Sequence, residues 1–308
     1  MQKDVSVGFI GFGEAGFEIA KGLRCEGVTR MVLFDSARTD LLENRAAEAG
    51  VEVTRGLKAL AEKSDLILSV VPPGVSVEVS RELLKHLKQG QFYLDLTSSF
   101  PEDMKSVAAM VKASGAHFVD GAMMGALPVH GHKVLIYVAG KQAETVARRL
   151  NAIGMNVKVV GSEPGQASAV KLILSVATKG FGSILVEMLL ASHYFDVDDP
   201  VLEALELFYT KGLPAYIDRN VGSSAIYAGR RVVEMEASAK LLKQIGVEPI
   251  MTDATVARLK WLDSLGLPDF FKGQVPGGYR EVLAAWEQMG LFARMPDRTP
   301  SEKKLSQS

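Results

Sequence analysis

A glycine-rich turn between a short apolar run and a helical pattern constrains this 308-residue chain most strongly. Residues 5–10 have the length and composition of a strand, GFGEAG follows at residues 11–16, and a helical pattern comes after it through Ile19, Ala20 and Leu23. In a G-x-G-x-x-G turn the first glycine permits the tight turn, the second admits a pyrophosphate, and the third lets the helix pack on the strand. The N–H groups that open the helix face the phosphates. The pattern predicts a dinucleotide-binding turn formed by Gly11, Gly13, Glu14, Ala15 and Gly16.

An acidic residue stands where this motif requires one. The next apolar run ends in Asp35, 19 positions after Gly16, and a carboxylate there accepts hydrogen bonds from ribose hydroxyls. Because the same carboxylate repels a 2′-phosphate, Asp35 favours NAD over NADP, and Arg38 is placed to soften that preference. The competing interpretation is a glycine turn that only serves packing.

Length and composition indicate two domains with a sizeable core. The chain is 47% hydrophobic, and 35 Lys+Arg residues nearly balance 36 Asp+Glu residues. With no basic stripe or interleaved aromatic and basic residues, we expect no nucleic-acid partner. Cys25 is the only cysteine, which excludes an internal disulfide and fits a cytoplasmic location. Because the first strand pattern starts near the N-terminus, we expect no signal peptide.

The first half of the chain alternates between strand and helix patterns. This alternation predicts an α/β fold with a doubly wound, mainly parallel sheet. After about residue 164 only helical patterns follow, so we expect a Rossmann-like domain over residues 1–162 and an all-helical domain over residues 163–293. Residues 294–308 lack periodic apolar residues, which predicts a disordered tail.

One helical pattern, from Pro164 to about His193, is unusually long and apolar. Lys179 and Glu187 interrupt its apolar segment, which favours a buried interdomain helix over a membrane span. Since this helix and the helical domain offer apolar faces that one subunit leaves uncovered, we expect a homodimer.

Ligands of open α/β sheets bind beyond the carboxyl ends of the strands. Three further segments should meet the glycine turn there: Val71-Pro72-Pro73, Thr97-Ser98, and a loop over residues 120–125.

The long helix should close this cleft with Lys171 and Ser175, which lie four positions apart and share a face. A lysine on an apolar wall is suited to exchange protons with a substrate, because burial lowers the pKa of an amine. The competing interpretation is a lysine whose stem packs while its amine reaches water.

Four separated segments, in order, are similar to the signatures of one enzyme family. They are GFIGFGEAG at residues 8–16, DLTSSFP at 95–101, FVD at 118–120 and GQASAVK at 165–171. Together they resemble the β-hydroxyacid dehydrogenases, which include 3-hydroxyisobutyrate and tartronate semialdehyde reductases and are related to 6-phosphogluconate dehydrogenase. The likeness covers about the first 190 residues.

The resemblance implies an NAD(P)-dependent oxidoreductase that transfers hydride between nicotinamide and a hydroxy or carbonyl substrate. It implies that Lys171 is the general acid/base, whose cation also stabilises negative charge on the substrate oxygen. It further implies that Val71, Pro72, Pro73, Thr97 and Ser98 line the cofactor.

The substrate segment departs from the family pattern. The family's D-x-P-V-S-G-G reads DGAMMGA here, so Met124 replaces a serine, and a thioether donates no hydrogen bond. A site lined by Met123, Met124 and Gly125 favours a bulkier or less charged compound over a small hydroxy acid. The alternative is that both methionines fill core space. Ser175 replaces the family's asparagine and keeps a hydroxyl for the substrate or for Lys171.

The helical domain departs as well and looks like that of a less characterised 6-phosphogluconate dehydrogenase-like subgroup. Counting back from GVEP at residues 246–249 aligns Val233-Glu234-Met235 with the family's K-D-L segment. Arg230 or Arg231, beside Glu234, is then a candidate clamp for substrate or cofactor. The competing interpretation, favoured for one arginine, is a surface ion pair with Glu234 or Glu236.

Two rival functions are compatible with the sequence, and a metal site is not expected. His130 and His132 flank Gly131 without a carboxylate cluster, so we expect loop histidines and no metal. The first rival is an imine reductase-like enzyme on the same scaffold. The second is a nicotinamide-binding sensor whose altered substrate loop has lost catalysis.

Overall fold

The computed structural model describes residues 3–72, 74–97, 99–125 and 127–294. Pro73 and Ser98 of the predicted cofactor site, and residues 295–308 of the predicted tail, lie outside the described residues. The chain divides into two compact units, Met1–Ala177 and Thr178–Ser308. The division falls within the long helix α8 (Gln166–Tyr194).

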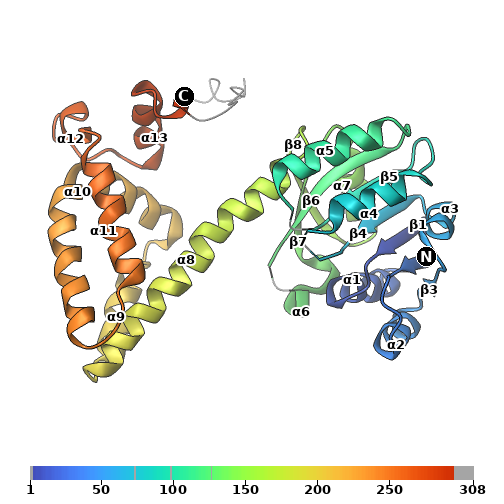
Figure 1. Cartoon of the computed structure of the whole chain (residues 1–308), viewed down its shortest axis with the longest axis horizontal. Coiled ribbons are helices and arrows are strands. Elements are labelled where there is room, and N and C mark those ends of the chain that lie inside the picture. The colour runs from blue at the N-terminus through green and yellow to red at the C-terminus, as the bar shows by residue number, and fades with distance from the viewer. Residues whose placement is uncertain (1–2, 73, 98, 126, 295–308) are drawn as a thin grey trace. The chain divides into compact units, whose positions relative to one another are not determined.

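Among the described residues, the first unit holds an eight-stranded sheet in the order β3-β2-β1-β4-β5-β6-β7-β8 (Figure 1). Neighbouring strands are parallel except β6 and β7, because the ten residues 125–134 between them are too few for a parallel crossover. The predicted doubly wound, mainly parallel sheet is confirmed. The strands are β1 (Lys3–Ile10), β2 (Val28–Phe34), β3 (Glu52–Val53), β4 (Leu66–Ser69), β5 (Phe92–Asp95), β6 (His117–Met124), β7 (Leu135–Ala139) and β8 (Asn156–Gly161).

Helices cover both faces of this sheet. One face packs against α1 (Glu14–Cys25), α2 (Asp40–Ala49) and α7 (Ala143–Ala152), and the other against α3 (Leu57–Lys63), α4 (Ser76–Leu84) and α5 (Pro101–Lys112). Leu66 and Leu68 belong to the first core and Ile67 to the second, as the two-residue period of a strand requires. Short turns α6 (Leu127–His130) and η1 (Gly131–Lys133) connect β6 to β7.

The carboxyl ends of the parallel strands lie in one row. Backbone pairing joins Phe34 to Ile10, Ile10 to Ser69, Ser69 to Asp95, and Asp95 to Asp120. The segments that follow these residues therefore leave the sheet at the same edge. This row contains the point between β1 and β4 where the strand order reverses, which is where such sheets bind ligands.

The predicted loop over residues 120–125 was wrong, because β6 continues to Met124. Aspartate and glycine are uncommon in strands, yet Asp120 and Gly121 lie within β6. Gly121 packs closely here: a β-carbon would lie 2.7 Å from Leu96 Cδ2 and 2.8 Å from Leu94 Cδ1, so these side chains would have to move to admit one. Packing thus outweighs local preference, and pairing with β7 completes the strand.

The described residues of the second unit form helices only, as predicted. Besides the C-terminal part of α8 they are α9 (Asp198–Leu207), α10 (Gly212–Gln244), α11 (Ile250–Asp263), α12 (Leu267–Phe270), α13 (Tyr279–Gln288) and η2 (Phe292–Arg294). A small core of Ala225, Leu267, Val282 and Ala285 joins α10, α12 and α13. Helix α10 is kinked at Tyr227, whose φ of −110° and ψ of 20° are not helical.

The prediction that α8 is buried was wrong for the single chain. Only 6% of its apolar window is buried, and Ile173, Val176 and Val186 are 69%, 77% and 58% exposed. With a mean hydropathy of 1.6, α8 is the one helix among the described residues that is long and apolar enough to cross a membrane. A helix of this length and composition can also be covered by another protein surface. The expectation that α8 does not span a membrane stays a prediction.

Glu187 of α8 fixes the start of α11. Its carboxylate accepts hydrogen bonds from the backbone N–H groups of Met251 and Thr252, the latter at 3.1 Å, and from Thr252 Oγ1 at 2.8 Å. The side chain is buried. A negative charge at this position satisfies N–H groups that have no partner within the helix and complements the helix dipole.

We expect Glu187→Ala to lower the free energy of unfolding by about 1–3 kcal/mol, because it leaves buried N–H groups without an acceptor. Urea titration followed by far-UV circular dichroism measures the change. Glu203→Ala, which removes an exposed carboxylate from α9, is the control. Equal losses in the two variants would contradict a capping role for Glu187.

Candidate functional site

The glycine turn has the geometry that the sequence predicts for a dinucleotide cradle. Gly11 has a φ of +84°, and a β-carbon there would lie 2.6 Å from the Val70 carbonyl oxygen. A β-carbon at Gly16 would lie 2.7 Å from the Gly11 carbonyl oxygen. At Gly13, by contrast, the position of a β-carbon has no atom within 4 Å. The first and third glycines thus serve close packing, while the second leaves open space that fits a pyrophosphate.

Helix α1 starts directly after this open position, at Glu14 and Ala15. Gly13 is its N-cap and provides no side-chain hydrogen bond to the first turn. The start of α1 is therefore suited to hold an anion with its backbone N–H groups.

Asp35 ties the glycine turn to the end of β2. Its Oδ2 accepts a hydrogen bond from Phe12 N at 2.7 Å, and its Oδ1 accepts one from Ala37 N at 2.9 Å. A carboxylate has about four acceptor positions, so these bonds leave capacity for ribose hydroxyls. Arg38 donates to the Thr54 carbonyl oxygen and lies 3.8 Å from Glu43, which gives its guanidinium partners within the protein.

Two more predicted cofactor segments leave the same sheet edge. Val71 is half-buried beside Gly11, whose β-carbon would lie 3.1 Å from Val71 Cγ1, and Pro72 is exposed. Thr97 follows β5, and its backbone N–H donates to Asp95 Oδ1 at 2.8 Å. Within the described residues, the buried hydroxyl of Ser99 has no hydrogen-bond partner, whereas the Thr97 hydroxyl lies beside Asp95. A buried hydroxyl without a partner is suited to a polar ligand, and together with the open space at Gly13 it fits a dinucleotide.

Asp95 is a buried carboxylate under these segments. Ser76 Oγ, at the start of α4, and Tyr93 Oη both donate to its Oδ2, Tyr93 at 3.4 Å. Burial raises the pKa of Asp95, the hydrogen bonds from Ser76 and Thr97 lower it, and nearby Asp120 raises it further. The side chain therefore joins the turn after β5 to the helix that follows the Val71 segment.

Asp120 is the second buried carboxylate, and it holds the start of α8. Its Oδ2 accepts hydrogen bonds from the backbone N–H groups of Gly165, Ala167 and Ser168 at 2.9, 3.0 and 3.1 Å. Its Oδ1 accepts one from Ser168 Oγ at 2.6 Å. Burial raises the pKa of Asp120, while the hydrogen bonds from Ser168, Gly165 and Ala167 lower it.

Lys171 lies on α8 shortly after this anchored turn and is half-buried. Ser175 Oγ donates to the Lys171 carbonyl oxygen at 3.0 Å. This bond lies within the helix, a common arrangement for a serine four residues after its acceptor. The predicted roles of Lys171 and Ser175 in catalysis stay predictions.

The two methionines of the substrate segment are half-buried. Met123 packs against the larger core of the sheet domain, and Met124 packs against a cluster of Ala122, Ala139 and Ala167. These contacts agree with the alternative in which the methionines fill core space. Gly125, which ends the segment, has a φ of +130° that favours glycine.

The predicted substrate residues of the second unit have partners on their own helix, α10. Arg230 Nε lies 3.2 Å from Glu234 Oε1, and both side chains are more than half exposed. Arg231 donates to the hydroxyls of Ser223, at 2.8 Å, and Ser224, so that it spans the kink at Tyr227. The predicted ion pair is therefore present for Arg230, and Arg231 has a structural role that the sequence did not suggest.

Of the two loop histidines, His132 packs against α1. His132 Nε2 lies 3.4 Å from Glu26 Oε1, and its ring fills the space beside Gly22 of α1. In the described part of the chain, no three His, Cys, Asp or Glu side chains come together as a metal site.

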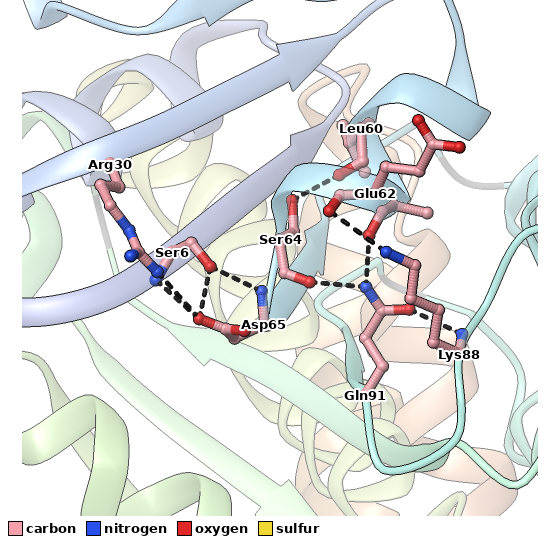
Figure 2. Close-up of polar contacts among 9 residues, drawn as sticks. Ser6, Arg30, Leu60, Glu62, Ser64, Asp65, Lys88 and Gln91 are labelled. Carbon is pink, nitrogen blue, oxygen red and sulfur yellow. Dashed lines mark hydrogen bonds and ion pairs between the residues drawn. The ribbon is translucent and has the colours of Figure 1, made fainter.

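A groove of about 930 Å³ lies at the opposite edge of the sheet, near the amino ends of β1, β4 and β5. Figure 2 shows its polar groups bonded to one another: Ser6 and Arg30 to Asp65, and Lys88 to Gln91 and to the Glu62 carbonyl oxygen. The Gln91 amide also donates to Ser64 at 2.6 Å. These groups stabilise the turns before β4 and β5, and the predicted site residues lie elsewhere.

Sequence reasoning missed the roles of Asp95 and Asp120. Asp95 ends an apolar strand pattern, and Asp120 interrupts one. A charged side chain is uncommon at such buried positions. An aspartate within such a pattern is a signal that could have identified both residues.

Comparisons with known proteins agree with this geometry. A family model described as the NAD binding domain of 6-phosphogluconate dehydrogenase matches residues 6–161. A domain of unknown function matches residues 192–262.

Three similar proteins illustrate the range of these matches. Mitochondrial 3-hydroxyisobutyrate dehydrogenase of Mus musculus is 29% identical over 190 residues, which cover 58% of this chain and 56% of that protein. A solved protein of unknown function, described as structurally similar to 3-hydroxyacid dehydrogenases, is 32% identical with a TM-score of 0.58, covering 84% of this chain and 97% of its own. An imine reductase variant of Myxococcus stipitatus, solved with NAD+, shares the fold with a TM-score of 0.70 at 16% identity, covering 86% of this chain and 95% of its own.

The match to residues 6–161 spans half of the chain, and it coincides with the sheet domain that carries the glycine turn. The chain therefore belongs to the family with the NAD-binding domain of 6-phosphogluconate dehydrogenase and is homologous to the 3-hydroxyisobutyrate dehydrogenases.

Proposed function

We propose that this chain is an NAD(P)-dependent oxidoreductase that interconverts an alcohol and a carbonyl compound, with Lys171 as general acid/base. The main support is the row of strand ends from Phe34 to Asp120. The glycine turn follows this row at one end, and Asp120 anchors the helix of Lys171 at the other. A cofactor bound along the edge would thus extend from the turn toward the start of α8.

The bound nicotinamide supplies or accepts the hydride. For carbonyl reduction, the Lys171 ammonium donates a proton to the substrate oxygen as the carbon gains the hydride. For alcohol oxidation, the neutral amine takes the hydroxyl proton. In both directions the positive charge stabilises the oxygen when it is most negative, which is why a lysine suits this role.

The proposal for the substrate class rests on Met124, which stands where the family has a serine. Because Met124 offers no donor where the family has a serine, the segment binds a carboxylate less well than a serine-bearing loop does. We therefore propose a substrate bulkier or less charged than a small hydroxy acid. The same apolar surroundings favour imine reduction as the second candidate, since an imine carries no carboxylate to be held.

We expect Lys171→Ala to lower kcat by about 10²–10⁴-fold, since it removes the proton-transfer group. Cofactor absorbance measures turnover on panels of hydroxy acids, alcohols, ketones and imines, and cofactor fluorescence measures the Kd for NADH and NADPH.

Lys171→Arg serves as a second test, because it keeps the charge but does not release a proton at neutral pH. Lys112→Ala, which removes an exposed lysine of α5, is the control. Normal turnover by Lys171→Ala would overturn the proposed mechanism. Cofactor binding with no turnover by the unmodified protein would favour the sensor.

We propose that Asp35 makes NAD the preferred cofactor. Asp35→Asn should raise the Kd for NADH by about 10-fold, because a charge-assisted hydrogen bond to ribose is lost. The Kd for NADPH should fall or stay constant. Asparagine keeps one acceptor oxygen, for Phe12 N, but places its amide beside Ala37 N, so any loosening of the turn should weaken binding of both cofactors alike. Parallel increases for both cofactors would contradict a role in discrimination.

We also propose a homodimer that covers the exposed apolar residues of α8, as the sequence led us to expect. Light scattering after size exclusion should give twice the chain mass, and Val186→Asp should yield monomers because Val186 is 58% exposed. Leu41→Asp, at a 58% exposed position on α2, is the control. A monomeric unmodified chain, or one that requires detergent, would contradict this proposal.

A further inference from the structure

The start of α8 is held by a side chain from another element. Its own cap position is Gly165, which has no side chain, and the N–H groups of Gly165, Ala167 and Ser168 all donate to Asp120 on β6. Three donors converge on one oxygen, so the carboxylate fixes where the helix begins. Its other oxygen accepts from Ser168 Oγ, which also fixes the rotation of the helix about its axis.

This rotation decides where Lys171 points. Residues four apart on a helix share a face, so Lys171 lies on the face of Ala167, about 6 Å further along the axis. Ala167 packs on Ala122 of β6 and Ala139 of β7, and Met124 packs against the same cluster. The face that carries Lys171 is therefore the face that contacts the strands bearing the substrate segment.

Neighbouring groups leave little freedom for this helix start. Gly165 has a φ of +96°, and a β-carbon there would lie 2.7 Å from the Pro101 carbonyl oxygen. The contact with Ala122 and Ala139 involves side chains of one carbon each, which allows close approach of helix and strands. Within such a tight contact, a change in the anchor would shift or rotate the helix rather than be absorbed by flexible side chains.

The negative charge of Asp120 also stabilises the start of α8. A negative charge beside the first turn complements the positive end of the helix dipole, and this interaction is strong because Asp120 is fully buried. Asparagine at this position can keep an acceptor for the N–H groups and place its amide next to Ser168 Oγ, but without the charge.

We propose that Asp120 is a positioning residue of the reaction, which through Ser168 and the first turn of α8 sets the direction of the Lys171 amine. This inference rests on the proposed function of Lys171. It extends that function to a residue that does not touch the substrate or the cofactor.

The test compares Asp120→Ala, Asp120→Asn and Ser168→Ala in the full-length protein. We expect Asp120→Ala to lower kcat by about 10²-fold, as displacements of about 1 Å do, with the KM and the cofactor Kd changed less than about threefold. Asp120→Asn should restore most of this loss, and Ser168→Ala should lower kcat by about 10-fold because one of four bonds is removed. Hydrogen exchange of residues 162–172 should quicken in Asp120→Ala and Ser168→Ala.

Asp40→Ala, which removes an exposed carboxylate from the first turn of α2, is the control and should leave kcat unchanged. If Asp120→Ala does not fold, Ser168→Ala decides. Faster exchange or a lower Tm with unchanged kcat in Ser168→Ala, or in Asp120→Ala where it folds, would overturn this inference but not the role of Lys171. Absent turnover in the unmodified protein, or full activity of Lys171→Ala, would overturn the proposed function and this inference with it.

Discussion

Parallel pairing in one register is the constraint on which the first unit depends. It brings Phe34, Ile10, Ser69, Asp95 and Asp120, which are distant in sequence, to one edge of the sheet. Because each following segment must leave the sheet there, a shift of one residue in any strand would exchange the side chains that face its two cores and move its loop. The two buried cores, which divide Leu66 and Leu68 from Ile67, make such a shift costly. The geometry of the site is therefore a consequence of core packing.

Buried carboxylates connect the elements that this register places side by side. Burying a charge costs free energy unless hydrogen bonds replace its hydration. Asp120 and Glu187 receive that replacement from the backbone N–H groups that open α8 and α11, which themselves lack acceptors within their helices. Asp95 receives it from Ser76 and Thr97. Each carboxylate and each set of donors thus satisfies the other, and a helix or turn is fixed in the process.

Local patterns predicted more of this protein than long-range contacts did. The glycine turn and Asp35 were identified because their roles depend on spacing within a single strand-turn-helix unit. The loop predicted at residues 120–125 failed because the pairing with β7 and the packing of Gly121 are not visible in local composition. The buried state predicted for α8 failed because apolarity does not reveal what covers a helix. The partners of Arg231 could not be predicted, since they lie across a kink that no proline marks.

The bend in α10 is supported by a side chain as well as by backbone geometry. Tyr227 departs from helical angles, and the Arg231 guanidinium reaches back across that point to Ser223 and Ser224. Because these hydrogen bonds hold the bend, the curvature of α10 can change independently of its two straight segments. Replacement of one residue would alter the stiffness of the bend while both straight segments, and the small core that they carry, keep their own sequences. A single substitution at Arg231 would therefore change the shape of α10 without altering the residues of the small core.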